Sequence, residues 1–595
     1  MVGERRKGAS NDALRGVARA GARGRHEERR AEKKVMPLPK RRPRRAGSVQ
    51  PSSEKRAVGR GRLRIIVGAV ALVCGSLGVR AAQVSFASDD HYQAFAAEQQ
   101  GTTAKDGAAR GAIVSADGRN LAMSLRASKV VATPYQIEDP KAAAGALAGV
   151  LGKEAEDASD IEKKLRPENG GYSVVAEGVE PEEASKVSEL GIAGISVEPD
   201  AVRTYPDNQL ASQLVGYLGA DRAYGGVEAR YDDTLKSGED VKLTIDVALQ
   251  QELEEELADA AKKYDGKSAL GVVLRAEDGA VMALANVPGY DNNRFGKATS
   301  EAQRNRVLTD PYEPGSTFKP FTMAAALEED AIAEGDTFVV PDHMQVADRM
   351  VHDSEQHETK IMTPKNILEQ SSNIGTIQVA QRLGGERLEE HIKDFGFGEG
   401  TGVDLGSEDP GRVPPLEEWS GSSIGNIPIG QGLTATPLQL AAGYATLANG
   451  GYRVTPYVSQ SDAPKGPGQR VISEKTSSIV REMLQSVVDE GTGHLARIPG
   501  YTAAGKTGTA QKVDPKTGLY GTEYVTSFIG FAPAKDPKYV ALIVVDEPQV
   551  EIWGEVVAAP AFSKLMSFAL EYSNVPPDRK EKESPAPTAT AGGAR

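Results

Sequence analysis

The longest uncharged apolar run of the chain, residues 65–79, separates two segments of opposite charge. Residues 1–64 contain 21 Lys and Arg but only six Asp and Glu, a net charge of +15, whereas the residues after them carry −28. Basic residues next to an apolar span stay on the cytoplasmic side of a membrane. The run therefore predicts a single-pass plasma membrane protein with a cytoplasmic N-terminus and most of its chain on the other side.

The predicted transmembrane helix covers residues 63–86. The apolar run has 15 residues and a bilayer needs about 20, so its flanks must complete the span, with Arg80 facing a partner or reaching towards the interface. A cleaved signal peptide and a buried core helix are the alternatives. The basic region before the run is far too long for a signal peptide, which favours the membrane span.

Residues 1–62 are rich in Arg, Ala, Gly and Pro and contain almost no large apolar side chains. Such a segment cannot bury enough surface to fold, so we expect a disordered basic arm in the cytoplasm rather than a nucleic-acid-binding module. The low-complexity C-terminal segment, 575–595, is also expected to be disordered. Cys74 is the lone cysteine and lies within the apolar run, so the exported part has no disulfide.

Residues 500–518, GYTAAGKTGTAQKVDPKTG, fit two unrelated motifs. Read as G-x-x-x-x-G-K-T they form a phosphate-binding P-loop, and the strand-like residues 540–547 with their Asp-Glu end could then hold magnesium. A P-loop must open a helix whose N-terminus faces the phosphates, but Gly508 and Asp514-Pro515 leave no room for one. Only about 90 residues follow for further βαβ units. The alternative, a K-T-G motif on a strand, is favoured.

Ser316 and Lys319 form an S-x-x-K motif at the predicted start of a helix. Pro314-Gly315 ends a loop, and TFKPFTMAAALEE then shows the apolar spacing of a helix. Lys319 would follow Ser316 by one turn on the same face. A desolvated lysine can accept the proton of a serine hydroxyl and make it a nucleophile. Alone the motif is weak, since a capping Ser and a solvated Lys give the same pattern.

Ser371 and Asn373 form an S-x-N element inside a segment predicted to be one helix, residues 364–383. The hydroxyl can relay a proton, and the amide can hydrogen-bond a peptide backbone in both directions. Each motif is unspecific alone. In the order S-x-x-K, S-x-N and K-T-G they form the motif set of penicillin-interacting serine enzymes.

With these motifs the chain resembles the class B penicillin-binding proteins, the monofunctional peptidoglycan D,D-transpeptidases of division and elongation. The resemblance covers residues 63–575 and includes NRVLTDPYEPGSTFKPF, FGFGEGTGVDL, GQGLTATPLQLAAGYATLANGG, GKTGTAQ and SFIGFAPAKDP. It implies an α+β architecture. Residues 243–574 are expected to form the serine β-lactamase/penicillin-binding transpeptidase fold, an antiparallel sheet flanked by helices, and residues 87–242 an α+β pedestal of the dimerisation type.

The resemblance also implies the acyl-transfer roles. Ser316 would attack the carbonyl of the penultimate D-Ala of a stem peptide, and Lys319 would take its proton. Ser371 would pass a proton to the departing D-Ala while Asn373 orients the peptide. An amine from a neighbouring stem would then resolve the acyl-enzyme and form the crosslink, and β-lactams would acylate the same serine.

By the same resemblance, the K-T-G strand would hold the terminal carboxylate of the substrate. Lys506 would supply the charge. Gly505 and Gly508 would let substrate backbone approach closely, and the backbone N–H groups of Ser316 and Thr509 would form the oxyanion hole. The substrate-binding residues beside the lysine are Thr507, Gly508 and Thr509.

Three further patterns are interpreted as chance matches. Lys516 repeats the K-T-G sequence within DPKTG, which has the composition of a turn between two strands. Ser423 in GSSIG lacks the preceding strand and following helix of a nucleophile elbow. His343, His352 and His357 show no metal-ligand spacing, so we expect no metal and no cofactor, and a loop that lines the cleft.

The implied partners are stem peptides that end in D-Ala-D-Ala, β-lactam antibiotics, the plasma membrane and other cell-wall machinery, with no nucleic acid. Residues 101–242 are too few for a glycosyltransferase module, so a polytopic membrane glycosyltransferase is expected as a separate partner. We expect a role in cell division, although the sequence itself does not separate division from elongation.

Two other functions use the same motifs. A serine β-lactamase needs a base that activates water, such as the glutamate of an E-x-x-L-N segment, and none occurs between Asn373 and Lys506. A non-catalytic penicillin-binding scaffold or sensor would not need the intact motif residues. Two positions depart from the family pattern: Ser115-Ala116 replaces Asp-Arg in the pedestal, and Glu555 replaces a frequent small residue near the cleft.

Overall fold

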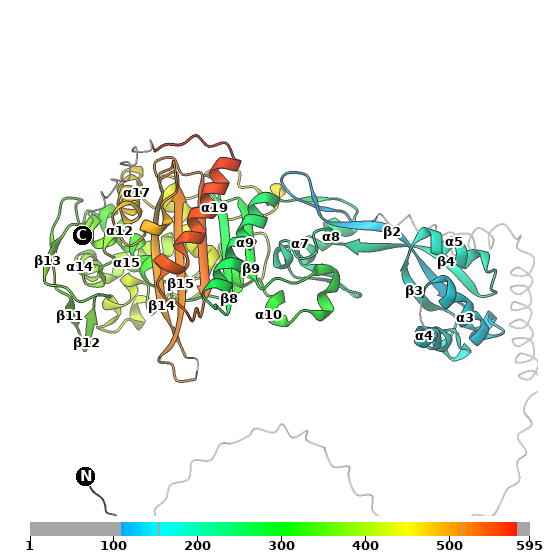
Figure 1. The fold of residues 1–595 in the computed structure, drawn as a ribbon. Helices are drawn as coiled ribbons and strands as arrows, with labels where there is room; N and C mark the ends of the chain where they lie inside the picture. The colour runs from blue at the N-terminus through cyan, green and yellow to red at the C-terminus, as the bar shows by residue number, and fades with distance from the viewer. Residues whose placement is uncertain (1–108, 153–154, 515, 580–595) are drawn as a thin grey trace, which may run out of the picture. The chain divides into compact units, whose positions relative to one another are not determined.

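The computed structural model describes residues 109–152, 155–514 and 516–579. The predicted basic arm, the predicted transmembrane helix and almost all of the predicted C-terminal tail lie outside these residues. Among the residues that are described, no helix combines the length and the apolar character of a membrane span. The described chain contains an N-terminal pedestal and a larger α+β part that carries the motifs (Figure 1).

The pedestal is built on a sheet in which β2 pairs antiparallel with both β3 and β4. Three helices pack around a small apolar core that includes Leu147, Leu165 and Val175. The Asp139 side chain accepts hydrogen bonds from the first turn of α3 and so caps it. The elements are β1 (Ile113–Val114), β2 (Asn120–Ala132), α3 (Pro140–Val150), α4 (Ala155–Leu165), β3 (Ser173–Val179), α5 (Pro181–Glu189) and β4 (Ile195–Thr204).

The turn between β1 and β2 holds the Ser115-Ala116 departure. Ser115 Oγ donates a hydrogen bond to Asp117 Oδ1 at 2.6 Å and accepts one from the N–H of Arg119 at 3.0 Å. A serine therefore closes this turn by its own hydrogen bonds, and β1 still pairs with β2.

A buried ion cluster joins the pedestal strands to the segment that leads into the larger part. The fully buried Glu228 binds Arg110 at 2.7 Å and Arg203 at 2.6 Å, and it accepts a hydrogen bond from the Tyr205 hydroxyl. A buried carboxylate requires such partners because an unpaired charge would be very costly. This segment contains α6 (Ser212–Val215), β5 (Tyr217–Leu218), β6 (Ala223–Tyr224), α7 (Gly226–Arg230), α8 (Asp232–Lys236) and β7 (Val241–Lys242).

The larger part is organised around a five-stranded antiparallel sheet of order β14-β15-β16-β8-β9. Successive residues of β16 enter two different cores: Val540, Leu542 and Val544 enter one, Ala541 and Ile543 the other. This follows from the two-residue period of a strand. The strands are β8 (Ser268–Arg275), β9 (Val281–Val287), β14 (Ala504–Val513), β15 (Tyr520–Ala532) and β16 (Tyr539–Asp546).

Helices cover both faces of this sheet, which explains why β16 is a continuous apolar run. On one face lie α9 (Val247–Lys263) and α19 (Ala559–Tyr572), whose side chains Leu253 and Phe562 belong to the same core as Ala541 (Figure 1). The strand β16 lies where the sequence predicts it. The predicted α+β fold, an antiparallel sheet flanked by helices, is confirmed for the described residues.

The helices of the opposite face carry two of the three motifs. Residues Lys319–Leu327 of α12 are all buried, in keeping with its lack of a polar face. The elements of this region are α10 (Ser300–Gln303), α11 (Arg306–Thr309), α12 (Lys319–Glu328), β10 (Phe338–Val340), β11 (His343–Val346), β12 (Arg349–His352), β13 (Lys360–Met362), α13 (Pro364–Glu369), α14 (Asn373–Leu383), α15 (Gly385–Asp394), α16 (Pro437–Ala448) and α17 (Glu474–Asp489). The short helix α18 (Gly554–Val557) lies instead with α9 and α19, since Val557 belongs to their core.

The prediction of one helix over residues 364–383 is wrong. α13 ends at Glu369 and α14 begins at Asn373, and Ser371 between them has a left-handed backbone with φ of +54°. Ser372 then caps α14 through its side chain. Ser and Asn side chains compete with a helix for backbone hydrogen bonds, which explains why the helix breaks at this sequence.

Lys516 and Ser423, the chance matches to catalytic motifs, lie in the local structure predicted for them. Lys516 is exposed in the hairpin connection between β14 and β15, where its backbone N–H donates to Asp514 Oδ1 at 2.8 Å. Ser423 begins a short 3-10 turn that follows a loop and another 3-10 turn instead of a strand. The strand–turn–helix of a nucleophile elbow is therefore absent around Ser423.

Candidate active site

The three motifs meet at a cleft in the larger part. Four of the predicted site residues, Ser316, Ser371, Thr507 and Thr509, line one cavity of 540 Å³. They come from the 3-10 turn η4 (Gly315–Phe318), from the corner between α13 and α14, and from the edge strand β14. Segments far apart in the sequence are thus brought together at one opening.

Lys319 follows directly after the turn that carries Ser316 and begins α12. Its side chain is fully buried, and Nζ donates hydrogen bonds to the carbonyl oxygen of Ser371 and, at 3.2 Å, to the Ser371 hydroxyl. A neutral amine has two N–H groups and one lone pair. With both N–H groups bonded to Ser371, the lone pair remains available to accept a proton, as a general base requires.

The charge state of Lys319 is set by its surroundings. Burial lowers its pKa from the usual 10.5 to about 7, because the ammonium form loses its hydration. The negative charge of Asp353 acts in the opposite direction. Near pH 7 both forms of Lys319 are therefore populated, whereas an ordinary lysine is almost entirely charged.

The turn that carries Ser316 is fixed by close packing. A Cβ on Gly430 would fall 2.2 Å from the carbonyl oxygen of Gly315, and Gly315 itself has φ of +57°, a conformation that favours glycine. The Thr317 carbonyl oxygen accepts a hydrogen bond from the buried Tyr444 hydroxyl at 2.8 Å. Ser316 is thus held on a rigid element, as precise catalysis requires.

The left-handed backbone of Ser371 turns both of its oxygens towards Lys319. Residues other than glycine adopt this conformation only where the surrounding structure holds them in it. Here the N–H of Ser371 is bonded to the Leu368 carbonyl at 3.1 Å and that of Ser372 to the Ile367 carbonyl at 2.9 Å. The corner thereby places a hydroxyl where it can relay a proton to or from Lys319.

Asn373 lies at the first position of α14, and its Nδ2 donates a hydrogen bond to the His352 carbonyl oxygen at 2.8 Å. It is not one of the residues that line the cavity. The amide nitrogen therefore braces the end of β12 in this structure. The role of Asn373 in orienting a bound peptide stays a prediction.

Lys506 is fully buried in β14, and its Nζ donates hydrogen bonds to the hydroxyl and carbonyl oxygens of Thr507 at 3.2 and 3.3 Å. Burial, and then the charge of Lys319, hold its pKa well below the usual 10.5, while Glu555 acts to raise it. Two buried ammonium groups that feel each other's field disfavour the doubly charged state. A carboxylate that enters the cleft would therefore stabilise the charged form of Lys506.

Gly505 and Gly508 fit β14 tightly into the protein. A Cβ on Gly508 would fall 2.4 Å from Ser527 Oγ and 2.8 Å from the Thr317 side chain, and one on Gly505 would meet the Ile529 carbonyl oxygen at 2.7 Å. Both glycines are thus needed for the packing of β14 against its neighbours. The close approach of substrate backbone, which the sequence suggested as their purpose, stays a prediction.

The cleft also contains residues that no motif in the sequence indicates. Thr492 Oγ1 lies 3.4 Å from Thr507 Oγ1, and Trp553 exposes 48% of its surface at the rim. An exposed aromatic ring next to polar groups is a typical ligand contact. These residues lie in connections before β14 and after β16, so only the fold brings them to the site.

Glu555, which replaces a frequent small residue, lines the same cavity on α18. The N–H of its neighbour Gly554 donates to Thr509 Oγ1 at 3.2 Å, which places α18 directly beside the K-T-G strand. The Glu555 carboxylate forms an ion pair with His494 and is close enough to raise the pKa of Lys506. A negative charge therefore stands next to the predicted carboxylate-binding residues.

Substitution of Glu555 by glycine is expected to speed acylation by an anionic penicillin about three- to tenfold, because one like charge is removed from the entry of the anion. The second-order rate of labelling measures this effect, and added salt should shrink it. The exposed Glu417 lies outside the cavity, so Glu417→Gly is the matched control. Equal rates for both variants and the unmodified protein would show that Glu555 does not influence anion entry.

The three histidines lie on and after the β11–β12 hairpin. His343 Nδ1 lies 2.6 Å from Asp342 Oδ1, and the rings of His343 and His352 face each other across the hairpin with centroids 5.8 Å apart. His357 lines the cleft, as predicted for this loop. Within the described ranges, no group of three or more His, Cys, Asp or Glu side chains is arranged to hold a metal ion.

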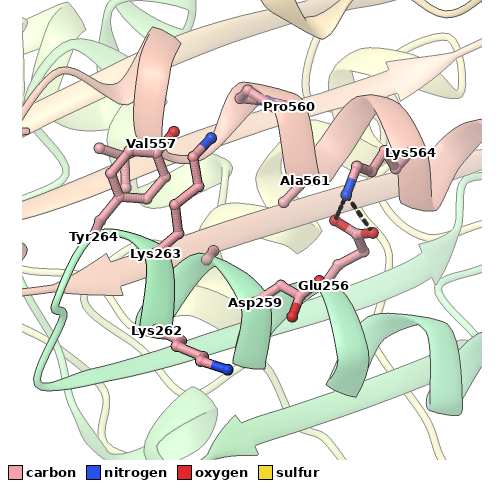
Figure 2. A pocket seen from close by; sticks show the side chains of 10 residues that line it. Glu256, Asp259, Lys262, Lys263, Tyr264, Val557, Pro560, Ala561 and Lys564 are labelled. Carbon is pink, nitrogen blue, oxygen red and sulfur yellow. Dashed lines mark hydrogen bonds and ion pairs between the residues drawn. The ribbon is translucent and has the colours of Figure 1, made fainter.

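A second cavity, of 470 Å³, is lined by residues of α9, α18 and α19 (Figure 2). Both acidic and basic side chains line it, and Lys564 Nζ is bonded to both carboxylate oxygens of Glu256 at 2.9 and 3.1 Å. The Tyr264 hydroxyl donates to the Val556 carbonyl oxygen. None of the motif residues lines this cavity, so it is separate from the candidate active site.

A serine on a fixed turn, followed by a buried and partly neutral lysine, has what acyl transfer needs, and the sheet with helices on both faces is the fold of penicillin-interacting serine enzymes. This is the class that the fold and the site define. A family model described as "Penicillin binding protein transpeptidase domain" matches residues 269–567, and one described as "Penicillin-binding Protein dimerisation domain" matches residues 105–270. The chain belongs to the penicillin-binding protein transpeptidases.

Curated relatives match along most of their length. Stage V sporulation protein D of Bacillus subtilis is 34% identical over 524 residues, covering 80% of this chain and 80% of the relative. Penicillin-binding protein PbpB of Mycolicibacterium smegmatis is 35% identical over 469 residues, or 71% and 72% of the two chains. The peptidoglycan D,D-transpeptidase FtsI of Escherichia coli K12 is 30% identical over 506 residues, or 79% and 84%.

A solved structure of a penicillin-binding protein has the same fold. The crystal structure of penicillin-binding protein 3 from Mycobacterium tuberculosis, complexed with aztreonam, superposes with a TM-score of 0.64 at 29% identity. The match covers 80% of this chain and 98% of the crystallised one. Sequence and structure therefore agree on a chain that combines a transpeptidase domain with a pedestal of the dimerisation type.

Proposed function

We propose that this chain crosslinks peptidoglycan as a D,D-transpeptidase, through an acyl-enzyme on Ser316, and that β-lactams acylate the same serine. The observation that carries the proposal is the buried Lys319, which follows the serine by one turn and is bonded to Ser371. The names of the relatives support the reaction, since the Escherichia coli protein is called a peptidoglycan D,D-transpeptidase. The Mycobacterium tuberculosis structure holds the β-lactam aztreonam.

In the acylation step, Ser316 Oγ attacks the carbonyl carbon of the penultimate D-Ala and its proton moves to Lys319. The N–H groups of Ser316 and Thr509 stabilise the oxyanion, each by about 3 kcal/mol. The amide bond to the terminal D-Ala then breaks, and Ser371 passes the proton from Lys319 to the departing nitrogen. The products are an ester on Ser316 and free D-Ala, with Lys319 neutral again.

The substrate itself selects which lysine carries the charge. Its terminal carboxylate stabilises protonated Lys506, and the positive charge of Lys506 lowers the pKa of Lys319 further. The base is thus neutral when a carboxylate-bearing substrate is bound. In the second step the neutral amine of another stem peptide attacks the ester, loses a proton to Lys319 and forms the crosslink, and Ser316 regains its proton.

The rate of acylation is expected to fall as the pH drops below about 7, by about tenfold per unit well below that value, because Lys319 must be neutral to accept a proton. The rate falls on acidification because the neutral form of Lys319, which is the active form of the base, is lost as the pH drops below its pKa. Stopped-flow labelling with a penicillin whose carboxylate stays ionised from pH 5 to 8 measures the dependence. A rate that is constant between pH 5 and 7 would exclude Lys319 as the base.

The transpeptidase proposal is tested with a donor peptide ending in D-Ala-D-Ala and an amine acceptor. We expect release of D-Ala and a new amide between donor and acceptor. Release of D-Ala with water as the sole acceptor would favour a hydrolase, and no release by folded protein would favour the scaffold. The expectation that no base for water activation lies between the S-x-N and K-T-G motifs supports the crosslinking reaction.

We further propose the division into a cytoplasmic arm (1–62), a membrane span (63–86), a pedestal (87–242), a catalytic domain (243–574) outside the plasma membrane, and a tail (575–595). Removal of the span should release the chain from membranes in an alkaline wash. A polytopic glycosyltransferase, contacted by the span and the pedestal, would supply the glycan strands for division. Co-purification from solubilised membranes tests that partner, and its absence from the complex would contradict this assignment.

A further inference from the structure

The corner that carries Ser371 is held by a carboxylate from a different part of the chain. Asp353 follows the last residue of β12, and its side chain is 6% exposed. Its Oδ1 accepts the backbone N–H groups of Asn373 and Ile374 at 2.5 and 3.0 Å, and its Oδ2 accepts the Ser372 hydroxyl at 2.7 Å. Three hydrogen bonds to one carboxylate thus fix the residues directly after Ser371 at the start of α14.

A histidine completes the environment of this carboxylate. His357 Nε2 lies 3.0 Å from Asp353 Oδ2, and His357 Nδ1 lies 2.7 Å from the carbonyl oxygen of Glu358. Carboxylate and carbonyl oxygens accept hydrogen bonds and cannot donate them. A neutral imidazole has a single N–H group and can satisfy only one of these two contacts. Both contacts are hydrogen bonds only if the ring carries two protons and a positive charge.

We propose that Asp353 and His357 form a positioning pair that holds the Ser371 corner against Lys319 in its active arrangement only while the imidazole ring is protonated. The inference rests on the proposed acyl transfer at Ser316. It assigns no chemical step to the pair, because neither side chain is placed on the reacting atoms. Its effect on the reaction passes through the corner and through the charge next to Lys319.

The first effect is structural. Asp353 and His357 both lie in the segment between β12 and β13. Protonated His357 is bonded to Asp353 and to the Glu358 carbonyl oxygen, and Asp353 connects this segment to the corner. Loss of the proton removes one of the two ring hydrogen bonds and leaves an acceptor facing the lone pair of a ring nitrogen. The carboxylate is then held less firmly. Ser371, whose left-handed backbone depends on its surroundings, loses part of its support.

The second effect is electrostatic and acts in the same direction. Asp353 alone raises the pKa of Lys319. While His357 is charged, the pair has no net charge and Lys319 more readily stays neutral. When His357 loses its proton, the pair becomes negative and favours the ammonium form of Lys319, which cannot act as a base. At a pH near the pKa of Lys319, loss of the His357 proton would thus reduce the neutral fraction of Lys319 and slow the reaction.

The groups around His357 favour its charged form. The Glu358 carbonyl and then the Asp353 carboxylate raise its pKa above the usual 6.5, whereas burial and the positive charge of Lys360 act against this. Asp342 also feels the ring, since His357 contributes to the lowered pKa of that carboxyl. The alkaline loss of activity should therefore begin above pH 6.5, next to the acidic loss that Lys319 produces.

The test is the pH profile of acylation for the full-length chain, compared with two substitutions of His357. We expect a bell-shaped profile for the unmodified protein. In His357→Gln, which can donate a hydrogen bond but carries no charge, the rate near pH 7 should fall about tenfold and the alkaline limb should disappear. In His357→Arg, which stays charged, the alkaline limb should also disappear. The acylation rate of this variant near pH 7 should stay closer to that of the unmodified protein.

His343→Gln is the matched control, because His343 lies in the same region but is bonded to Asp342 at the surface. Its profile should equal that of the unmodified protein, and melting curves should show that all variants are folded. A His357→Gln variant that keeps the full bell-shaped profile would overturn the inference. So would an unmodified protein that acylates without any alkaline loss.

A second measurement does not depend on activity. Hydrogen–deuterium exchange at the C2 position of each histidine, followed by mass spectrometry, reports the pKa of His357 directly. A value clearly above 6.5 that falls in Asp353→Asn supports the pair, and a value at or below 6.5 overturns it. If no acylation occurs at all, the proposed function fails, while this titration still decides whether the pair exists.

Discussion

Replacement of Ser316 by alanine is expected to abolish covalent labelling by penicillin, with a loss of at least about 10⁴-fold in the rate. The reason is the arrangement of the turn η4: it places this hydroxyl in the cavity and just ahead of the buried Lys319. The Ser371 hydroxyl already accepts a hydrogen bond from Lys319 and serves as the relay in the proposed mechanism. Fluorescent penicillin followed by denaturing electrophoresis measures the label.

Ser423→Ala is the matched control for this experiment. Ser423 lies in the G-x-S-x-G sequence but in a short 3-10 turn without the structure of a nucleophile elbow. Its substitution should leave the label unchanged. A stable label that survives Ser316→Ala but is lost in Ser423→Ala would refute the assignment of the nucleophile.

The second large effect is expected at Lys319. Replacement by methionine, which fills a similar volume without a base, should slow acylation about 10²- to 10⁴-fold, the range for loss of a general base. The two Ser371 oxygens that bind Nζ also lose their donor. The variant should therefore be destabilised by about 1–3 kcal/mol. Labelling rates with a large excess of penicillin separate slow chemistry from weak binding.

Lys516→Met is the control for the lysine substitution. Lys516 also stands in a K-T-G sequence, but it is exposed in a hairpin, and its loss should change neither the rate nor the melting temperature. The assignment of Lys319 as the base would be contradicted by Lys319→Met protein that is folded and is still acylated at the unmodified rate. It would also be contradicted by a large loss in Lys516→Met.

Much of the fold could be predicted because its signals are local. The DPKTG composition predicts the hairpin that contains Lys516, and the run 540–547 predicts a strand. The S-x-x-K motif could be placed at the start of a helix and the K-T-G motif on a strand for the same reason. Each depends on residues within a few positions of one another, and their common order in the chain made the family clear.

The remaining features depend on tertiary contacts. The side chains of residues 371–373 favour a break in the helix predicted for 364–383, but the contacts of the corner with Lys319 and Asp353 fix the backbone of Ser371 in its position. No short segment contains that information. The lowered pKa of Lys319 also follows from burial, which the sequence around it does not reveal. In the sequence, His357 stands out only as one of three nearby histidines, and the fold alone shows that its ring faces Asp353.

The effect of Glu555 could not be predicted from the family pattern alone. Its position near the cleft was expected, but the effect of an acidic residue depends on its neighbours. The structure places it next to Thr509 through Gly554, pairs it with His494 and lets it act on Lys506. The K-T-G strand of this chain therefore has a negative charge beside it, and this charge is expected to affect the reaction with anionic ligands.

The central claim is that Ser316 forms a long-lived acyl-enzyme that awaits an amine. The most direct measurement is the intact mass of the full-length chain over time after a single addition of benzylpenicillin, followed by peptide mapping of the adduct. We expect one adduct per chain, located on Ser316, that persists after free penicillin is removed. An adduct on another residue would contradict it. So would an adduct that disappears within seconds while hydrolysed penicillin accumulates, which would make the protein a β-lactamase.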